Sequence, residues 1–247
     1  MSAEPWSEWT PVDPGFSLQP RVLGELLDGG QTFLWDGIAN DPERGPLWEG
    51  VLNESLAQLS LNAERVVHFR VPRNTSVDET RAALAAWFRL DEDLKGILGR
   101  LDLDNDPYLK GCVQRFPGLR ILNQPVSEVI LTFLCSSNKR IVQIKRMLRE
   151  LSRRFGARCG GGRHSYPSWP RLAEAALEEV LACGAGYRGK YILGSARIIA
   201  ASPDFFSDLA QCDYAAAKPM LMELPGVGGK VADCILLYGC GRYEAFP

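Results

Sequence analysis

Short apolar runs separated by turn-forming residues occupy the first part of the chain, from Phe16 to about Arg70. Four such runs, at 32–35, 47–52, 56–61 and 65–70, are broken by Asp36-Gly37, Asn53-Glu54 and Asn62. Apolar runs of this length between turn residues are typical of strands. We therefore expect an antiparallel sheet, with the tryptophans of this region packed against it.

After Ser76 the spacing of apolar residues becomes helical. Residues 77–90 and 94–101 each repeat apolar side chains at intervals of three and four, which predicts two amphipathic helices. Asp102, Asp104 and Asp106 follow in one loop. A calcium loop is not expected there, because the sixth position is not glycine and the twelfth is not glutamate. The aspartates are instead expected to cap the next helix.

Pro117-Gly118 is the expected boundary between two domains. Beyond it, Ser127 is expected to cap an apolar helix that carries Phe133, and Asn138 is expected to cap the helix that follows. The predicted fold class is α+β. An N-terminal antiparallel-sheet domain with helices, residues 1–117, would precede an all-α domain, residues 118–247.

Positive charge is concentrated in one helical segment of a chain whose net charge is −2. Residues 139–158 contain eight basic residues and one acidic residue, a net charge of +7. An apolar stripe on the same segment indicates that the opposite face packs on a core. Such a segment is often only a solvated helix face. Because the rest of the chain is acidic, contact with nucleic-acid phosphates is the favoured interpretation.

A glycine-rich turn between two helices lies within residues 221–238. The turn Pro225-Gly226-Val227-Gly228-Gly229 follows a helix expected to end near Leu224, and a second helix is expected to open at Lys230. Glycines let the backbone approach another molecule closely, and the amides at a helix N-terminus favour an anion such as a phosphate. Side chains three and four residues apart share a helix face. An amine, a carboxylate and a thiol can therefore meet in one site, formed by Lys230, Asp233 and Cys234.

Four segments together resemble one enzyme family. LPGVGGKVADCILL, GQTFLW, FLCSSN and GAGYRGKY are similar to segments of the 8-oxoguanine DNA glycosylases, in the helix-hairpin-helix/Gly-Pro-Asp superfamily of base-excision repair enzymes. The resemblance implies a helix-hairpin-helix glycosylase domain at 118–247. It also implies removal of 8-oxoguanine from duplex DNA through a lysine Schiff base, followed by strand cleavage as an AP lyase.

The resemblance assigns roles to particular residues. Lys230 would be the catalytic nucleophile, beside a base pocket to which Gly30, Phe133 and Cys234 contribute. The carbonyl of Gly30 would accept a hydrogen bond from the protonated N7 of 8-oxoguanine, which guanine lacks. The residues implied in DNA binding are Asn138, Gln143, Tyr187, Arg188, Gly226, Gly228 and Gly229. No cofactor is expected, apart from a monovalent or divalent cation at the hairpin.

The sequence departs from the family in two places. Gln143 stands where many members have an arginine that reads the opposite cytosine, and glutamine lacks the planar cationic group. The catalytic aspartate of the superfamily follows the motif proline by two residues, whereas this sequence stops at Pro247. We therefore expect a truncated glycosylase. The alternatives are a non-catalytic helix-hairpin-helix DNA-binding module and a glycosylase for another damaged purine.

The remaining composition excludes several other classes of protein. Seven widely spaced cysteines with no CxxC pair favour free thiols over a disulfide framework or a zinc site. Two histidines give little support for a histidine triad or metal site. No signal peptide or membrane span is expected. The expected protein is a monomer that binds double-stranded DNA with an oxidised purine, in the cytoplasm or nucleoid of a bacterium or the nucleus of a eukaryote.

Overall fold

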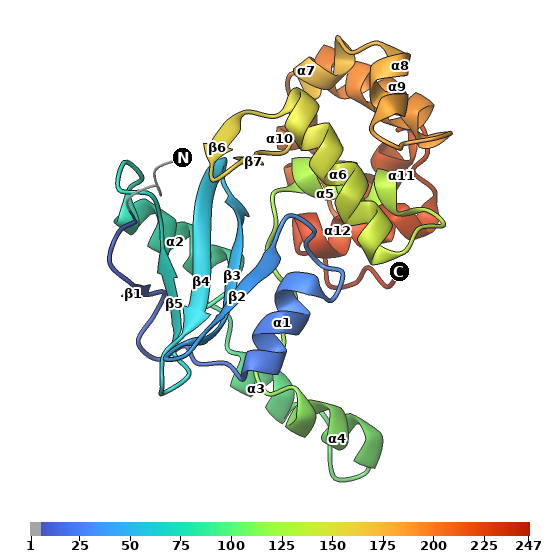
Figure 1. Ribbon diagram of the computed structural model, residues 1–247. Coiled ribbons are helices and arrows are strands. Elements are labelled where there is room, and N and C mark those ends of the chain that lie inside the picture. The colour runs from blue at the N-terminus through green and yellow to red at the C-terminus, as the bar shows by residue number, and fades with distance from the viewer. Residues whose placement is uncertain (1–5) are drawn as a thin grey trace. The chain divides into compact units, whose positions relative to one another are not determined.

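The chain folds into two compact units, residues 1–122 and 123–247, in a computed structural model that describes residues 6–247. The first unit contains β1 (Thr10–Pro11), α1 (Pro20–Asp28), β2 (Asp36–Asp41), β3 (Gly45–Leu52), β4 (Ser55–Leu61), β5 (Val67–Arg70), α2 (Val77–Trp87), α3 (Leu94–Gly99) and α4 (Pro107–Arg115) (Figure 1). The predicted antiparallel sheet is present, in the order β1-β5-β4-β3-β2.

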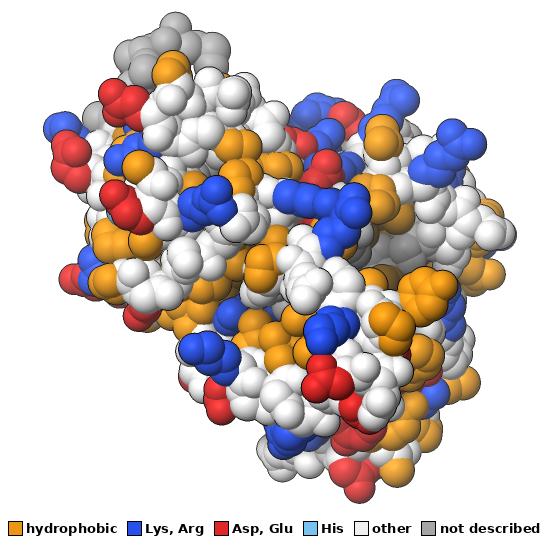
Figure 2. All heavy atoms as spheres, turned by 90° about the horizontal axis from the view of Figure 1, so that it is seen from below, with side chains coloured by type: hydrophobic (Ala, Val, Ile, Leu, Met, Phe, Trp, Pro, Cys, Tyr) orange, Lys and Arg blue, Asp and Glu red, His pale blue; other side chains and the backbone are white. Residues whose placement is uncertain are grey.

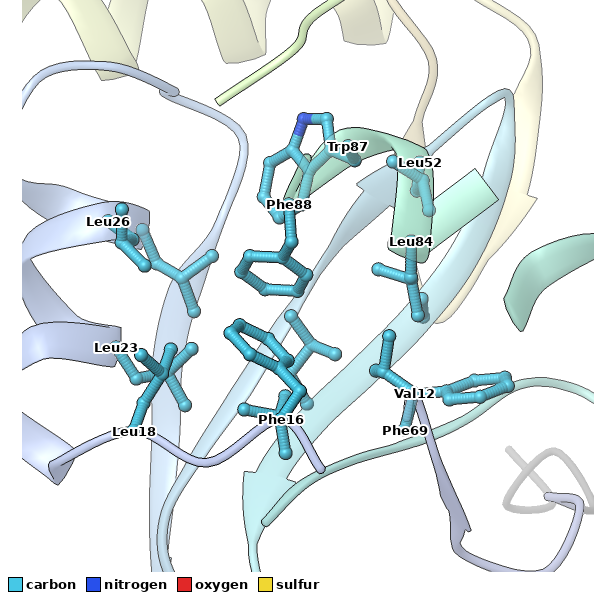
Figure 3. Close-up of a cluster of buried hydrophobic side chains, with 14 of the residues drawn as sticks. Val12, Phe16, Leu18, Leu23, Leu26, Leu52, Phe69, Leu84, Trp87 and Phe88 are labelled. Atoms are coloured by element: carbon cyan, nitrogen blue, oxygen red, sulfur yellow. The ribbon is translucent and has the colours of Figure 1, made fainter. Parts of the chain in front are cut away.

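The core of the first unit lies on one face of this sheet. Strand residues alternate between its two faces. Leu59 and Phe69 therefore point into the same apolar cluster as residues of α1 and α2. The rings of Phe16 and Phe88 face each other in this cluster, with centroids 5.0 Å apart (Figure 3). On the opposite face Gln58 bonds Glu49 and Arg70, at 2.9 and 2.8 Å.

The predicted strand at residues 32–35 is wrong. This segment is a loop, and the strand begins at Asp36, inside the predicted turn. The apolar run instead anchors the loop, because Trp35 is buried and stacks on Trp87 at 5.6 Å. Gly50 leaves room for the ring, since a Cβ on this residue would lie 2.2 Å from Trp35. Pairing with β3, rather than local propensity, creates β2.

The boundary between the units lies after Leu122, five residues beyond the predicted Pro117. The side chain of Gln31 holds the intervening segment in the first unit. Its Nε2 donates to the Arg120 carbonyl at 3.0 Å, and its Oε1 accepts from the Leu122 amide at 2.9 Å. A boundary prediction that uses only the positions of proline and glycine cannot take such long-range hydrogen bonds into account.

The second unit is helical apart from a two-stranded ribbon. It contains α5 (Val126–Ser136), α6 (Ile141–Phe155), β6 (Arg158–Gly160), β7 (Arg163–His164), α7 (Trp169–Ala173), α8 (Leu177–Ala182), α9 (Arg188–Ala201), α10 (Phe205–Gln211), α11 (Tyr214–Met222) and α12 (Gly229–Cys240). The α5 helix is buried from Val129 to Cys135 and packs against α6, α9 and α12. Among residues 6–247, no helix is long and apolar enough to cross a membrane.

Two of the predicted caps are wrong and one is confirmed. The α5 helix begins at Val126, with Pro125 as its cap residue, so Ser127 lies inside the first turn. Asn138 has a left-handed φ of 51° and does not cap α6, whose cap residue is Arg140. Asp106 does cap α4, because its side chain accepts from the Leu109 amide at 2.8 Å. Within residues 6–247, His, Cys, Asp and Glu form no cluster suited to a metal ion.

Candidate active site

The glycine turn joins α11 to α12 as the sequence predicts. The α11 helix ends at Met222, and α12 opens at Gly229, one residue before the predicted start. Gly226 has a φ of +86°, and its missing side chain makes room for the ring of Tyr191 on α9. The Pro225 carbonyl accepts a hydrogen bond from the Ser195 hydroxyl at 3.1 Å. The turn is thus fixed against α9 rather than free in solvent.

Lys230 is the second residue of α12 and is exposed. Within residues 6–247 its ammonium makes no hydrogen bond or ion pair. The first amides of α12 lack acceptors within the helix, and the helix dipole disfavours a cation at this end. The side chain of Lys230 is therefore available to react.

Asp233 does not pair with Lys230, although the two residues share a helix face. Its carboxylate accepts from Lys218 Nζ at 2.8 Å and from the Tyr214 hydroxyl at 2.8 Å, both on α11. Burial by itself would raise the pKa of Asp233, but these two hydrogen bonds and the lysine charge hold the pKa below its ordinary value. Lys218 and Tyr214 were not among the predicted site residues. Their i,i+4 spacing before the hairpin was the available signal.

Cys234 lies one turn after Lys230 and is 7% exposed. Burial raises the pKa of its thiol, and the charge of Lys230 opposes this rise only in part. A thiol must ionise before it can act as a nucleophile. The structure therefore favours the amine of Lys230, and not the thiol of Cys234, as the nucleophile on this helix face.

Phe133, an expected base-pocket residue, packs within the second unit. It is 9% exposed and stacks on Tyr238 of α12, with centroids 5.6 Å apart and an interplanar angle of 12°. Phe133 thus occupies a core position, as its place on an apolar helix face permits. The stack joins α5 to the helix that carries Lys230.

Gly30 is also an expected base-pocket residue. It lies in the first unit, just after α1. Its φ of +105° is a conformation that residues with a side chain rarely adopt. No group within residues 6–247 donates a hydrogen bond to its carbonyl. The acceptor that the resemblance implies is therefore available.

The expected DNA-binding residues of the second unit differ in exposure. Tyr187 is 54% exposed and meets Tyr191 edge to face. Arg188 is only 3% exposed and donates to the carbonyl of Ser137, directly before Asn138. A direct contact of Arg188 with DNA would require its side chain to leave this position. Asn138 itself is exposed.

The α6 helix carries the predicted basic face. Ile144, Leu148 and Leu151 are buried on its other side. Two arginines are neutralised, because Arg153 pairs with Glu150 and Arg154 pairs with Glu179. Arg140 and Arg146 are exposed and form no ion pair within residues 6–247, so they remain available for an anion.

The hydrogen bonds of Gln143 and the charge distribution on the surface limit which contacts the chain can make with a nucleic acid. The Oε1 atom of Gln143 accepts from the Arg140 amide at 3.1 Å, which leaves its NH₂ group to donate. On the face shown in Figure 2, basic side chains lie among acidic side chains and do not form one continuous field. Attraction of an anion must therefore be local, as at the N-terminal part of α6.

The cysteines should differ widely in their reactivity. Cys112 is exposed, whereas burial raises the pKa of Cys135 from 9.0 to about 12. At neutral pH that shift leaves about a thousandfold less thiolate. Brief alkylation followed by peptide mass spectrometry is expected to label Cys112 first, and Cys112→Ser should remove the fast phase. Rapid labelling of Cys135 in the folded protein would contradict the packing described.

The chain is similar to known DNA repair proteins. Residues 16–130 match the family described as the N-terminal domain of 8-oxoguanine DNA glycosylase. N-glycosylase/DNA lyase OGG1 of Arabidopsis thaliana is 30% identical over 88% of the chain, and the N-glycosylase/DNA lyase of Saccharomyces cerevisiae is also 30% identical over 88%. The chain spans 60% and 62% of the lengths of these relatives.

A solved structure has the same fold. Clostridium acetobutylicum 8-oxoguanine glycosylase/lyase, in complex with double-stranded DNA containing cytosine opposite 8-oxoguanine, superposes with a TM-score of 0.79 at 28% identity. The match covers 91% of this chain and 75% of that one. The sequence motifs and the α+β fold agree with these comparisons, and the chain is similar to the 8-oxoguanine DNA glycosylases in both sequence and fold.

Proposed function

We propose that the protein acts on duplex DNA that contains 8-oxoguanine, as a glycosylase with AP lyase activity. The observation that carries this proposal is the placement of Lys230. It is an exposed amine without a partner among residues 6–247, at the start of α12 and directly after the glycine turn. The relatives named N-glycosylase/DNA lyase support the same chemistry.

In the proposed reaction, the neutral amine of Lys230 attacks C1′ of the damaged nucleoside and the bond to the base breaks. The base leaves with the electron pair and takes up a proton. Opening of the sugar ring gives a Schiff base between Lys230 and C1′. Loss of a proton from C2′ then expels the 3′-phosphate, and hydrolysis of the imine releases the lysine. Stabilisation of the developing cation at the sugar must come from a group other than Asp233, since Lys218 already pairs with that carboxylate.

DNA recognition would use separate parts of the chain. The turn Gly226, Gly228 and Gly229 would grip the backbone, and Tyr187 would wedge between bases. Asn138 and the NH₂ group of Gln143 would donate to the base opposite the lesion. Gly30 would accept from N7 of 8-oxoguanine. A cation at the hairpin would be held by backbone carbonyls, because no side-chain cluster for a metal exists among residues 6–247.

The test is reductive trapping of the chain on three duplexes. One carries 8-oxoguanine opposite cytosine, one a preformed abasic site, and one no damage. We expect a covalent adduct with the first two and none with the third, because the reagent reduces only a Schiff base. An adduct restricted to the abasic duplex would show a competent lysine without base excision by these residues.

A DNA-binding module without catalysis is the second candidate, favoured by the exposed Arg140 and Arg146 on α6. It predicts binding without an adduct on any duplex. In that case Arg146→Gln would weaken binding and reduce its salt dependence, while replacement of Lys230 would not. A glycosylase for another damaged purine would instead give an adduct with a lesion that lacks the 8-oxo group, independently of Gly30.

A further inference from the structure

Three polar side chains form a closed hydrogen-bonded triangle between the two helices of the hairpin. Lys218 donates to Asp233 Oδ2 at 2.8 Å and to the Tyr214 oxygen at 2.9 Å, and Tyr214 donates to Asp233 Oδ1 at 2.8 Å. The side chain of Asp233 is 10% exposed and that of Lys218 is 29% exposed. Both carboxylate oxygens are therefore occupied by donors from α11. We call these three residues the hairpin triangle.

The hairpin triangle lies next to the expected nucleophile. Asp233 is three residues after Lys230, so both side chains project from one face of α12. The side chain of Lys218 also lies near the start of this helix, because a Cβ on Gly229 would lie 4.0 Å from Lys218 Cε. Without Lys218, the buried carboxylate would have Lys230 as the cation on its own helix face.

We infer that Lys218 and Tyr214 are positioning residues that hold and neutralise the Asp233 carboxylate, so that Lys230 can lose its proton and act as an amine. This inference rests on the proposed function of Lys230. An unpaired carboxylate on the same face would favour the ammonium form of Lys230 and so slow the reaction at neutral pH. The triangle prevents this while keeping α11 and α12 in register.

Within residues 6–247, the other ionisable groups on α12 and on the helices near it do not supply a second carboxylate beside Lys230. Cys234 is a buried thiol whose pKa is raised by burial. On α5, Cys135 is buried and interacts with the charge of Arg188. Burial and the charge of Glu128, on the same helix, together raise the pKa of Tyr166. The α9 helix brings the ring of Tyr191 against Gly226. Among these elements, Asp233 is the one carboxylate on the face of Lys230, and Lys218 is its ion-pair partner.

The test separates this role from a merely structural one by a pH profile. The intact chain is incubated with reductant and a duplex that carries a preformed abasic site. The initial rate at which the reduced covalent adduct forms is measured from mildly acidic to mildly alkaline pH. We expect Lys218→Met, which keeps an unbranched side chain of similar but shorter length and removes its charge, to move the midpoint of the profile upward by about one pH unit. Below the midpoint, the adduct would form about tenfold more slowly.

The double variant Lys218→Met/Asp233→Asn supplies the matched control. It removes both charges, so the midpoint should return to the value of the parent chain even if the melting temperature stays lowered. Lys218→Arg keeps the positive charge and should leave the midpoint near that of the parent chain. Lys230→Gln gives the background at every pH.

The outcomes distinguish the two proposals. A lysine-dependent adduct in the parent chain with an unchanged midpoint in Lys218→Met would overturn the role of the triangle and leave the proposed function intact. No lysine-dependent adduct in the parent chain would overturn both. Should Lys218→Met fail to fold, Tyr214→Phe removes both hydrogen bonds of the tyrosine hydroxyl and keeps the ion pair between Lys218 and Asp233. A smaller upward shift in that variant would support the inference, and no shift would refute it.

Discussion

Lys230→Gln is expected to abolish the reduced protein–DNA adduct, leaving only background signal at every pH. A primary amide cannot form the imine that hydride reduces, whereas the other properties of the position change little. Lys230 is exposed and has no partner within residues 6–247. Its replacement should therefore alter the free energy of unfolding by no more than about 0.5 kcal/mol. The adduct is measured on denaturing gels after single-turnover trapping.

A matched control is Lys110→Gln on α4. Lys110 pairs with Asp104 at 2.8 Å and belongs to the first unit, so the same chemical change should leave the adduct unaffected. DNA affinity, measured in parallel, should fall only slightly in Lys230→Gln because one positive charge is lost. An adduct that persists in Lys230→Gln would assign the chemistry to another amine. Lys218, whose side chain reaches Gly229, would be the first to examine.

Gly226→Ala is expected to lower the free energy of unfolding by about 2–4 kcal/mol, the sum of a left-handed backbone cost and overpacking. Gly226 has a φ of +86°, and a Cβ there would lie 2.7 Å from Tyr191 Cγ and 2.8 Å from Tyr191 Cβ. A rotation of the Tyr191 side chain cannot relieve the second contact, because its Cβ is fixed by the backbone of α9. Thermal and denaturant unfolding measure the loss.

Gly228→Ala provides the comparison within the same turn. Gly228 has a φ of −93°, and a Cβ there would meet no atom within 4 Å. Its stability should remain within about 0.5 kcal/mol of the parent chain. Any loss of DNA affinity in Gly228→Ala would therefore report close approach of the nucleic acid to the turn. Equal stability of the two variants would show that the contact with Tyr191 does not fix the hairpin.

Local features of the molecule could be predicted from the sequence because they depend on neighbours along the chain. The turn from Pro225 to Gly229, the helix that follows it and the apolar stripe of α6 each depend on residues a few positions apart. The antiparallel sheet was predictable for the same reason, through its apolar runs and the turn at Asn53-Glu54. The placement of Lys230 at a helix N-terminus follows directly from these local signals.

Caps and strand ends were less predictable because several local solutions compete. Ser127 and Asn138 are both good capping residues, yet Pro125 and Arg140 occupy the cap positions of α5 and α6. The apolar segment that ends at Trp35 has the composition of a strand, but no strand within residues 6–247 pairs with it. Tertiary packing decides such cases, since the burial of one ring over Gly50 outweighs the local β propensity of the segment.

The sequence by itself determined the local chemistry of this protein: a flexible glycine turn, an amine at the start of a helix, and a cationic helix before them. Only the tertiary structure decided which partners these groups have. Asp233 bonds Lys218 and not Lys230, and Arg188 turns inward to Ser137. The physical reason is that these pairs lie 15 and 51 residues apart in the chain. Contacts over such separations form only when the whole unit has folded.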